Sequence, residues 1–568
     1  MPYRAPVSDF RFLMDHIVGF DEVAATETFA EATSDMTQAI LTEAAKMSEE
    51  VIAPLNRAGD QHPAFLENGI VRTSPGFADG YSAIAEGGWI GMSASQEVGG
   101  LGLPMTLTTV VNEMLASACL ALQLSPLMTQ GQIEALEHHA SDALKQLYIP
   151  KLISGEWNGT MNLTEPQAGS DVGALRTKAE PNGDGTYAIT GQKIYISWAD
   201  NDFTTNVCHL VLARLPGGVA GTKGISLFMV PKLIPDAEGN PGEKNDLRVV
   251  SLEHKMGLHG SPTAVMEYSG ATGWLVGEAH AGMAAMFTMM NNARLGVGVQ
   301  GVGVAEAALQ HALAYAQDRK QGKASGSGAI IEHADVRRML TTMKADTYAA
   351  RAIAMMNAVA IDMAAATADA GWQARAAFLT PIGKAFGSDV GCEVSATGIQ
   401  VHGGMGFIEE TGAAQLARDV RVTAIYEGTN GIQAIDLVAR KLMDGGEAAF
   451  RLLEEIEQGA EAARATHPQL AEAVWQSAET LRETTEWLVS QDDLNNRFAG
   501  AVPYLRAFAR VLGGHVHLAS AIAGDASRAR LATFYIKRML PEHIGLLAHV
   551  REGADDLMAI SAAELAAR

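Results

Sequence analysis

The sequence predicts a multidomain α+β fold in which helical segments flank one β-rich module. At 568 residues the chain is too long for a single hydrophobic core, so two to four domains are expected. The apolar spacing changes from helical to alternating near residue 159 and returns to helical near residue 281. A Gly-Gly pair after Asp444 indicates a hinge. The predicted domains are 1–158, 159–280, 281–444 and 445–568.

The first domain is predicted to be helical after an N-terminal extension. Apolar residues recur there at steps of three or four, which draws one stripe along a helix: Met36, Ile40, Ala44, Met47 and Val51. Pro54 follows the stripe and predicts that the helix ends there.

The second domain is predicted to be a small antiparallel barrel or sandwich. The segment GTYAITGQKIYISW (185–198) alternates polar and apolar residues after an Asp-Gly turn signal. Two short runs rich in β-branched or bulky residues follow at 207–215 and 224–232. The polar segment 234–246 is predicted to be a long loop within this domain.

The third and fourth domains are predicted to be helical. The segments at 305–320 and 336–366 have the length expected of bundle helices. In the last domain, Pro468 and Pro503 lie where helices are expected to start.

Composition excludes some classes of protein. A net charge of −23 repels phosphate backbones and disfavours nucleic acid as a partner. The three cysteines are far apart, show no metal-ligand spacing, and suit buried thiols in a reducing compartment. The N-terminus lacks signal-peptide features, and no stretch approaches the roughly 18 apolar residues of a membrane span. These features predict a cytoplasmic protein without a membrane span.

One carboxylate, Glu427, stands between an aromatic residue and a glycine in the segment AIYEGTNGIQ (424–433). The following residues predict a helix start, with Asn430 as the N-cap and Gln433 reaching back. Taken alone, the pattern leaves open a solvated turn or an anion that favours the helix N-terminus.

Five motifs occur in order along the chain: MNLTEPQAGSD (161–171), GQKIYIS (191–197), DRKQG (318–322), IQVHGGMGF (399–407) and IYEGTNGIQ (425–433). Together they resemble the acyl-CoA dehydrogenase family of flavoproteins, over about residues 30–443. The resemblance implies an N-terminal helical domain, a middle antiparallel β-barrel and a C-terminal four-helix bundle that binds FAD. The segment 445–568 is then an additional helical domain.

In the family, the first motif lies along the flavin ring. The backbone around Leu163 and Thr164 would hydrogen-bond the pyrimidine end, and Ser170 would lie near the flavin pyrophosphate or the CoA. Donors at the pyrimidine end suit a flavin that accepts hydride, because negative charge builds up there.

In the second motif, the resemblance places the ring of Tyr195 over one flavin face, with Ile196 beside it and the hydroxyl of Ser197 near N5. The family usually carries Trp and Thr in place of Tyr195 and Ser197. Arg319 matches the arginine that pairs with the FAD pyrophosphate across a subunit interface, which suits a guanidinium fork. The remaining cofactor contacts implied by the resemblance are Gln321, His333, Gln400, Gly403, Gly404 and Thr429.

Glu427 occupies the place of the family's catalytic base. That base takes the α-proton of an acyl-CoA while hydride leaves the β-carbon for the flavin. A free Glu has a pKa of about 4.3, so the thioester carbonyl must be polarised; the family uses the base's own backbone N–H and a ribityl hydroxyl of FAD. Desolvation under bound substrate should raise the pKa of the carboxylate. Substrate contacts implied by the resemblance are Ser170, Asn291, Arg294 and Gly428, with a solvated Arg294 at a bundle end as the alternative.

The segment 252–263, the N-terminal extension and the C-terminal domain resemble a longer bacterial subgroup that includes 3-methylmercaptopropionyl-CoA dehydrogenases. The resemblance implies 3-(methylthio)propanoyl-CoA or another short- or medium-chain acyl-CoA as substrate. It also implies electron-transferring flavoprotein as the acceptor, and a homodimer. Two alternatives stay open, an acyl-CoA oxidase that uses oxygen and a DNA-associated flavoprotein, the latter because RARLATFYIKR (528–538) is a small basic cluster.

Overall fold

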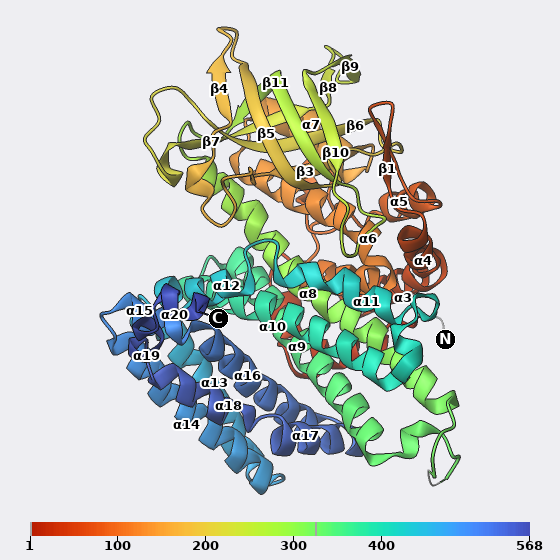
Figure 1. Ribbon diagram of the computed structural model, residues 1–568, viewed down its shortest axis with the longest axis vertical. Coiled ribbons are helices and arrows are strands. Elements are labelled where there is room, and N and C mark those ends of the chain that lie inside the picture. Colours follow the sequence, from red (N-terminus) through yellow and green to blue (C-terminus); the bar gives the residue numbers. More distant parts are fainter. Residues whose placement is uncertain (1–2, 324–325, 568) are drawn as a thin grey trace. The chain divides into compact units, whose positions relative to one another are not determined.

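The computed structural model describes residues 3–323 and 326–567, which form two compact units (Figure 1). The barrel unit is Asp35–Gly296, and the bundle unit combines Pro6–Ser34 with Val297–Arg568. Helix α8 (Gly282–Asp318) runs from the barrel unit into the bundle unit, so the division falls inside a helix. The four-domain division made from the sequence stays a prediction.

Five helices precede the sheet of the barrel unit: α3 (Ser34–Met47), α4 (Ala53–Gln61), α5 (Phe77–Glu86), α6 (Met105–His139) and α7 (Asp142–Ile153). The predicted helix end at Pro54 is wrong. A π-helical turn, Ser48–Ile52, joins α3 to α4, and Pro54 lies in the first turn of α4. The proline lacks the N–H that would bond to the preceding turn, and the wider π-helical turn before it accommodates that missing hydrogen bond without ending the helix.

The barrel unit contains eleven strands: β1 (Phe65–Glu67), β2 (Ile70–Arg72), β3 (Trp157–Asn162), β4 (Lys178–Pro181), β5 (Tyr187–Ser197), β6 (Asn206–Arg214), β7 (Ile225–Pro231), β8 (Leu233–Pro235), β9 (Pro241–Lys244), β10 (Leu247–Leu252) and β11 (Thr263–Val276). The pairing runs β11–β5–β4–β6–β7 and returns to β11, which closes a ring, with β10 and β3 added at its sides. Most pairs are antiparallel, as predicted, whereas β6 runs parallel to β3 and to β4.

The segment 234–246 contains more regular structure than predicted. Instead of a loop alone, β8 and β9 pair as an antiparallel hairpin within it. Its strands are short and largely exposed or half-buried, so they show no alternation of apolar and polar residues that the sequence could reveal.

The alternating segment 185–198 coincides with β5, which packs its buried side chains into the barrel core. Ile189 and Ile196 belong to that core. Lys193 is also fully buried on β5, at a position where the alternation alone would favour an apolar residue. Tyr195, next to the buried Ile196, is exposed.

The bundle unit is helical in its described residues. Its helices besides α8 are α1 (Val7–His16), α2 (Phe20–Ala24), α9 (Ala334–Thr367), α10 (Ala370–His402), α11 (Ala413–Val420), α12 (Asn430–Asp436), α13 (Glu447–Ala463), α14 (Pro468–Ser490), α15 (Leu494–Ala499), α16 (Ala501–Ala523), α17 (Ala526–Arg538), α18 (Glu542–Arg551), α19 (Asp555–Ala559) and α20 (Ala562–Ala566). Helices α9 and α10 pack along each other, and α16 packs against both and against α12 (Figure 1). The additional C-terminal helices therefore contact the bundle directly.

The N-terminal extension folds with the bundle unit. The guanidinium of Arg351, a buried residue of α9, lies 5.0 Å from the ring centre of Phe10 in α1. Arg528 of α17 forms an ion pair with Asp9 at 2.9 Å, and its guanidinium lies 3.6 Å from the ring centre of Phe12. Helix α1 is thus tied to both the bundle and the C-terminal helices.

Among the residues that the structure describes, two helices, α6 and α9, are long and apolar enough to cross a membrane by length and composition. Most of the apolar window of each helix is buried within the fold, as in the core helices of globular proteins. The predicted burial of the cysteines is confirmed for Cys119 and Cys208, while Cys392 is half-buried, and all three are free thiols.

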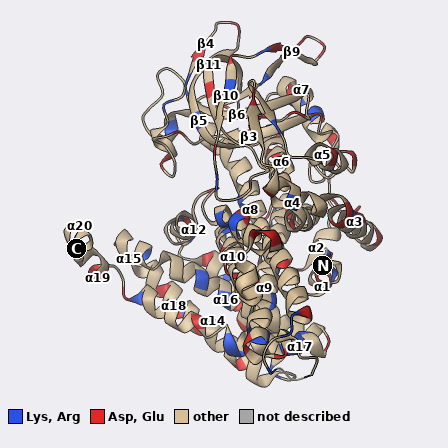
Figure 2. Cartoon of the chain, turned by 45° about the vertical axis from the view of Figure 1, so that its right-hand side comes forward, with Lys and Arg blue, Asp and Glu red and all other residues tan. Residues whose placement is uncertain are grey.

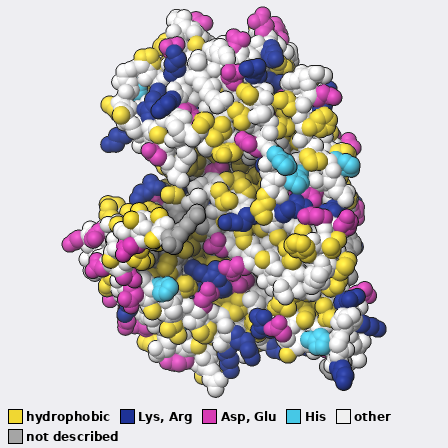
Figure 3. Space-filling model, viewed as in Figure 1, with side chains coloured by type: hydrophobic (Ala, Val, Ile, Leu, Met, Phe, Trp, Pro, Cys, Tyr) yellow, Lys and Arg dark blue, Asp and Glu magenta, His cyan; other side chains and the backbone are white. Residues whose placement is uncertain are grey.

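Charged side chains of both signs are mixed on the surface. Figure 2 shows Lys and Arg interspersed with Asp and Glu along the helices, and Figure 3 shows the same mixture on one face. On the face that Figure 3 shows, the Lys and Arg side chains of the described residues form no continuous stripe of the kind that nucleic-acid-binding proteins present.

Candidate active site

Glu427 lies in a turn with an uncommon backbone conformation, just before α12. Its φ is 56° and that of Gly428 is 83°, so two consecutive residues are left-handed. A left-handed conformation outside glycine costs on the order of 1–3 kcal/mol and persists only where neighbouring groups hold it. The side chain of Glu427 is half-buried.

The helix after this turn is capped one residue earlier than predicted. The hydroxyl of Thr429 accepts the N–H of Ile432 at 3.3 Å, so Thr429 is the N-cap and the prediction of Asn430 is wrong. The side chain of Asn430 instead faces α10. Gln433 reaches back beyond the cap residue, and its amide nitrogen donates to the carbonyl oxygen of Glu427 at 3.1 Å.

Tyr426, beside the acid, is fixed by a hydrogen bond. Its hydroxyl donates to the side-chain oxygen of Gln300 in α8. Burial raises the pKa of Tyr426 well above its ordinary value, and the neighbouring charge of Glu427 raises it further, so this phenol stays neutral at physiological pH.

The predicted flavin residues Leu163 and Thr164 follow β3 in the barrel unit. The ammonium of Lys193 donates to the carbonyl oxygen of Leu163 at 3.0 Å, and the N–H of Ile194 donates to that of Thr164 at 2.9 Å. With both carbonyls engaged inside the unit, the segment offers its N–H groups and the Thr164 hydroxyl to a ligand. A donor set of this kind fits the pyrimidine end of a flavin.

A buried ion pair anchors this segment. Lys193 and Glu165 lie 2.8 Å apart, with side chains 0% and 4% exposed. Glu165 also accepts the backbone N–H groups of Arg176 at 2.6 Å and Thr177 at 3.0 Å. Burial alone would raise the pKa of Glu165, but the charge of Lys193 and these hydrogen bonds outweigh it and lower the pKa to about 2.

In the second motif, the ring of Tyr195 is exposed and the side chain of Ile196 is buried. Tyr195 has a φ of 61° and is 61% exposed, so its ring is accessible to a ligand. The side chain of Ile196 is buried in the barrel core, so only its backbone can meet a cofactor. Ser197 is half-buried at the end of β5.

The predicted substrate residues of the barrel unit differ in exposure. Arg294 is buried in α8, donates to the side-chain oxygen of Asn291 at 3.4 Å, and lies 5.9 Å from the ring centre of Phe287. The alternative of a solvated arginine is therefore wrong. Ser170 is exposed in the turn after β3.

Three predicted cofactor residues gather where α8 ends and α9 begins. The carbonyl of Arg319 accepts the N–H of Ile330 at 2.8 Å, and an imidazole N–H of His333 donates to the carbonyl of Gln321 at 2.8 Å. Arg319 itself is exposed. An exposed guanidinium is a donor group that fits a diphosphate, whereas the N–H of His333 is already engaged by the carbonyl of Gln321.

The glycine-rich segment after α10 is open. Gly403 has a φ of 60°, and no atom lies within 4 Å of the Cβ position of either Gly403 or Gly404. Gln400 is exposed on the last turn of α10. Met405 and Phe407, which follow, are 48% and 84% exposed.

The predicted residues therefore form separate groups within each unit. Residues 163–164 and 195–197 are brought together by Lys193 and Ile194 of β5. Sequence reasoning missed Lys193 and also Lys384 of α10, which donates to the carbonyl of Gly428 at 2.9 Å. Periodicity cannot distinguish such buried lysines from surface ones, and their partners are distant in the chain.

The basic segment 528–538 forms most of α17. Arg528 is engaged with Asp9 and Phe12, as described, and Tyr535 and Ile536 are buried. This helix is thus built into the bundle unit, which disfavours the DNA-associated alternative.

Four family models match the chain in succession. They are the acyl-CoA dehydrogenase N-terminal domain (residues 34–156), middle domain (160–271) and C-terminal domain (280–443), and the acetyl-CoA dehydrogenase C-terminal like domain (452–561). The last match covers most of the additional helical segment.

The chain is 45% identical to the 3-methylmercaptopropionyl-CoA dehydrogenase of Ruegeria pomeroyi, over 93% of this chain and 92% of that protein. Its fold resembles Caenorhabditis elegans ACDH-11 in complex with C11-CoA (TM-score 0.79, 19% identity, 98% of this chain and 96% of that chain). It also resembles an acyl-CoA dehydrogenase complexed with FAD from Bacillus anthracis (TM-score 0.73, 21% identity, 97% and 92%). The chain therefore belongs to the acyl-CoA dehydrogenase family of FAD-dependent oxidoreductases.

Proposed function

We propose that the protein oxidises an acyl-CoA thioester to the trans-2-enoyl-CoA, with Glu427 as the catalytic base. The observation that supports this role most directly is the left-handed turn at Glu427 and Gly428, which is held by hydrogen bonds to both carbonyls. When bound, FAD supplies the two-electron acceptor. Glu427 takes the α-proton of the substrate while the β-hydrogen leaves with its electron pair.

The carboxylate needs help, because an α-C–H is a far weaker acid than a Glu with an ordinary pKa near 4.3. The backbone N–H of Glu427 would polarise the thioester carbonyl and stabilise the developing enolate. Exclusion of water by bound substrate would make the carboxylate a stronger base.

The cofactor contacts of this proposal are those named from the motifs, with Ile196 acting through its backbone. They are Leu163, Thr164, Ser170, Tyr195, Ile196, Ser197, Arg319, Gln321, His333, Gln400, Gly403, Gly404 and Thr429. Ser170, Asn291, Arg294 and Gly428 are proposed to bind the substrate.

The proposed substrate is 3-(methylthio)propanoyl-CoA, because the 45% identical relative is named for that acyl group. The test is a panel of acyl-CoAs, from butanoyl to octanoyl and including 3-(methylthio)propanoyl-CoA, mixed anaerobically with the FAD-loaded protein. The thioether substrate is expected to bleach the flavin absorbance fastest. Faster bleaching by a straight-chain acyl-CoA would overturn the substrate, and no bleaching by any member would overturn the activity.

Electron-transferring flavoprotein is the proposed electron acceptor, and the proposed location is the cytoplasm. Turnover with substrate and that acceptor should proceed without oxygen consumption. Oxygen consumption matched to product formation would instead establish the oxidase alternative.

We also propose a homodimer. Met405, Phe407 and Ile408 expose apolar side chains beside the open Gly403, which suits contact with a second copy of the chain. Sedimentation should give the mass of two chains, and Phe407→Asp should shift it towards one. A mass near four chains, or one unchanged by Phe407→Asp, would contradict this interface.

A further inference from the structure

The turn that carries Glu427 is supported from behind by a lysine of α10. The ammonium of Lys384 donates to the carbonyl oxygen of Gly428 at 2.9 Å and to the side-chain oxygen of Asn430 at 2.9 Å. Lys384 is 1% exposed. A buried ammonium directed at the backbone next to the base ties the position of the turn to α10.

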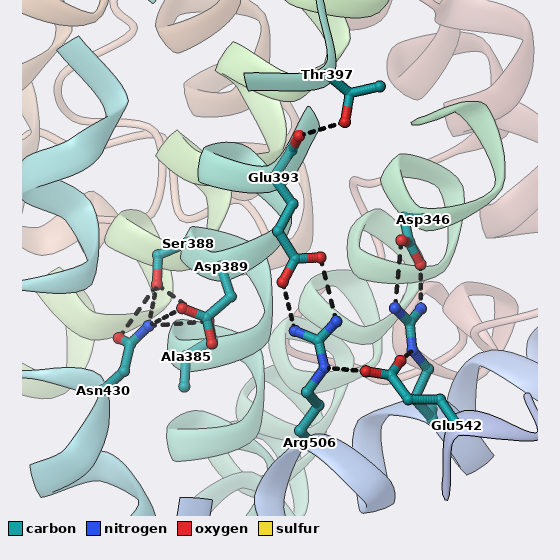
Figure 4. Close-up of polar contacts among 10 residues, drawn as sticks. Asp346, Ala385, Ser388, Asp389, Glu393, Thr397, Asn430, Arg506 and Glu542 are labelled. Carbon is teal, nitrogen blue, oxygen red and sulfur yellow. Dashed lines mark hydrogen bonds and ion pairs between the residues drawn. The ribbon is translucent and has the colours of Figure 1, made fainter. Parts of the chain in front are cut away.

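Asn430 joins the turn to a second part of α10. Its amide nitrogen donates to Asp389 at 2.6 Å, to the hydroxyl of Ser388 at 3.0 Å and to the carbonyl of Ala385 at 3.3 Å. Figure 4 shows the Asn430 side chain facing these three residues across the space between α12 and α10. The amide therefore accepts from an ammonium on one side and donates to a carboxylate on the other.

These contacts explain how the turn keeps its conformation. Left-handed φ values at Glu427 and Gly428 are held by donors to both carbonyls, Gln433 at the first and Lys384 at the second. The direction of the Glu427 side chain follows from its backbone, since a rotation of the turn would carry the carboxylate with it. Small displacements of a catalytic group have large effects on rate, of the order of 10²-fold for about 1 Å.

We propose that Lys384 and Asn430 are positioning residues that act as one unit to orient Glu427 for proton removal. The inference rests on the proposed role of Glu427 as the base. Neither residue contacts the reacting atoms, so their loss should slow proton removal far more than it weakens acyl-CoA affinity, to which Gly428 of the same turn contributes.

The test is anaerobic rapid mixing of FAD-loaded Lys384→Met, Asn430→Ser and the double variant with the acyl-CoA that bleaches the native protein fastest. Each single variant should lower the limiting bleaching rate about 10²-fold, with an apparent Kd for acyl-CoA within about threefold. The double variant should lose no more than the worse single variant, because residues that act as a unit are not additive.

Thr397→Ala is the matched control. Thr397 also lies on α10 and donates only along its own helix, to the carbonyl of Glu393 at 2.8 Å. This variant should retain the native rate. If Lys384→Met fails to fold, the limiting bleaching rate of Asn430→Ser and its apparent Kd for acyl-CoA test the proposal by themselves.

Native limiting rates in the single variants, a loss confined to affinity, or losses that multiply in the double variant would each overturn the proposal. Failure of the underlying function looks different. In that case the native protein would not bleach with any acyl-CoA, or Glu427→Gln would bleach at the native rate.

Discussion

Two motif segments, one in each unit, are held by a buried lysine that donates to a backbone carbonyl. In the barrel unit, Lys193 donates to Leu163 at 3.0 Å. In the bundle unit, Lys384 donates to Gly428 at 2.9 Å. The same device thus supports the proposed flavin segment and the proposed base.

The two regions differ in whether the buried lysine contacts a carboxylate directly or through another side chain. Lys193 contacts Glu165 directly, and both side chains are buried. Beside Lys384, the carboxylate of Asp389 is reached through the amide of Asn430. The direct ion pair between Lys193 and Glu165 stabilises the barrel unit, whereas the contacts of Asn430 with Lys384 and Asp389 mainly orient the turn at Glu427. Loss of Lys193 should therefore appear first as lost stability, and loss of Lys384 as lost rate.

The largest effect on stability is expected for Lys193→Met. Removing one partner of a buried ion pair leaves a buried charge and costs about 3–5 kcal/mol. Hydrogen exchange measured by mass spectrometry should show faster exchange, and thus lost protection, in peptides from β3 and β5. Lys178→Met is the control, because its pair with Glu180 is exposed and worth about 0–1 kcal/mol. Equal protection from exchange in Lys193→Met and Lys178→Met would contradict a stabilising role for the buried ion pair.

The second prediction concerns pH. The folded-state pKa of Glu165 is depressed to about 2, so its stabilising contribution is present above the ordinary Glu pKa of about 4.3 and is lost as the pH falls towards 2. Near neutral pH, the free energy of unfolding of the native protein should exceed that of Glu165→Gln by on the order of 2–3 kcal/mol. Urea unfolding followed by circular dichroism should show the difference shrinking between pH 4.5 and 2. A difference that stays constant across that window would contradict the ion pair's role.

The third prediction tests the turn. In Gly428→Ala, the residue would have to hold a φ of 83°, and its Cβ would lie 2.8 Å from the amide nitrogen of Gln433. Strain of about 1–2 kcal/mol is expected, with a roughly tenfold slower limiting bleaching rate as the turn shifts. Gly545→Ala is the control, since no atom lies within 4 Å of that Cβ position. A native rate in Gly428→Ala would show that the turn tolerates distortion.

The smallest effect is expected at the C-terminal helices. Arg506 of α16 pairs with Glu393 of α10 at 2.5 Å and with Glu542 at 2.7 Å (Figure 4). Because Glu393 lies one turn beyond Asp389, Arg506→Gln should slow bleaching two- to fivefold, or about 1 kcal/mol or less. Arg482→Gln breaks a pair with Glu457 away from α10 and should leave the rate unchanged. Identical bleaching rates in Arg506→Gln and Arg482→Gln would show that the C-terminal helices do not influence the turn at Glu427.

Much of the fold follows from local patterns. The alternation in 185–198 predicted β5, and the motif order predicted the family that the comparisons confirm. Strand direction is not encoded in such patterns, so the parallel pairing of β3 with β6 was not foreseen. The packing of α1 on the bundle unit depends on contacts such as Arg528 with Asp9, which are 519 residues apart.

The site shows the same limit. The motif pointed to Glu427, and the sequence placed a helix start after it, but it assigned the cap to Asn430. Thr429 caps instead, because the Asn430 side chain is occupied by Lys384 and Asp389. A lysine that will be buried has no local signature, and Lys384 lies 44 residues from the carbonyl it contacts.

The central claim is that Glu427 removes the α-proton, and single-turnover mixing of FAD-loaded Glu427→Gln with acyl-CoA tests it most directly. The native protein and Glu410→Gln, which changes an exposed carboxylate, should bleach at the same rate. Glu427→Gln should bind FAD and lose up to about 10⁴-fold in bleaching rate. Bleaching by Glu427→Gln at the native rate would contradict the account.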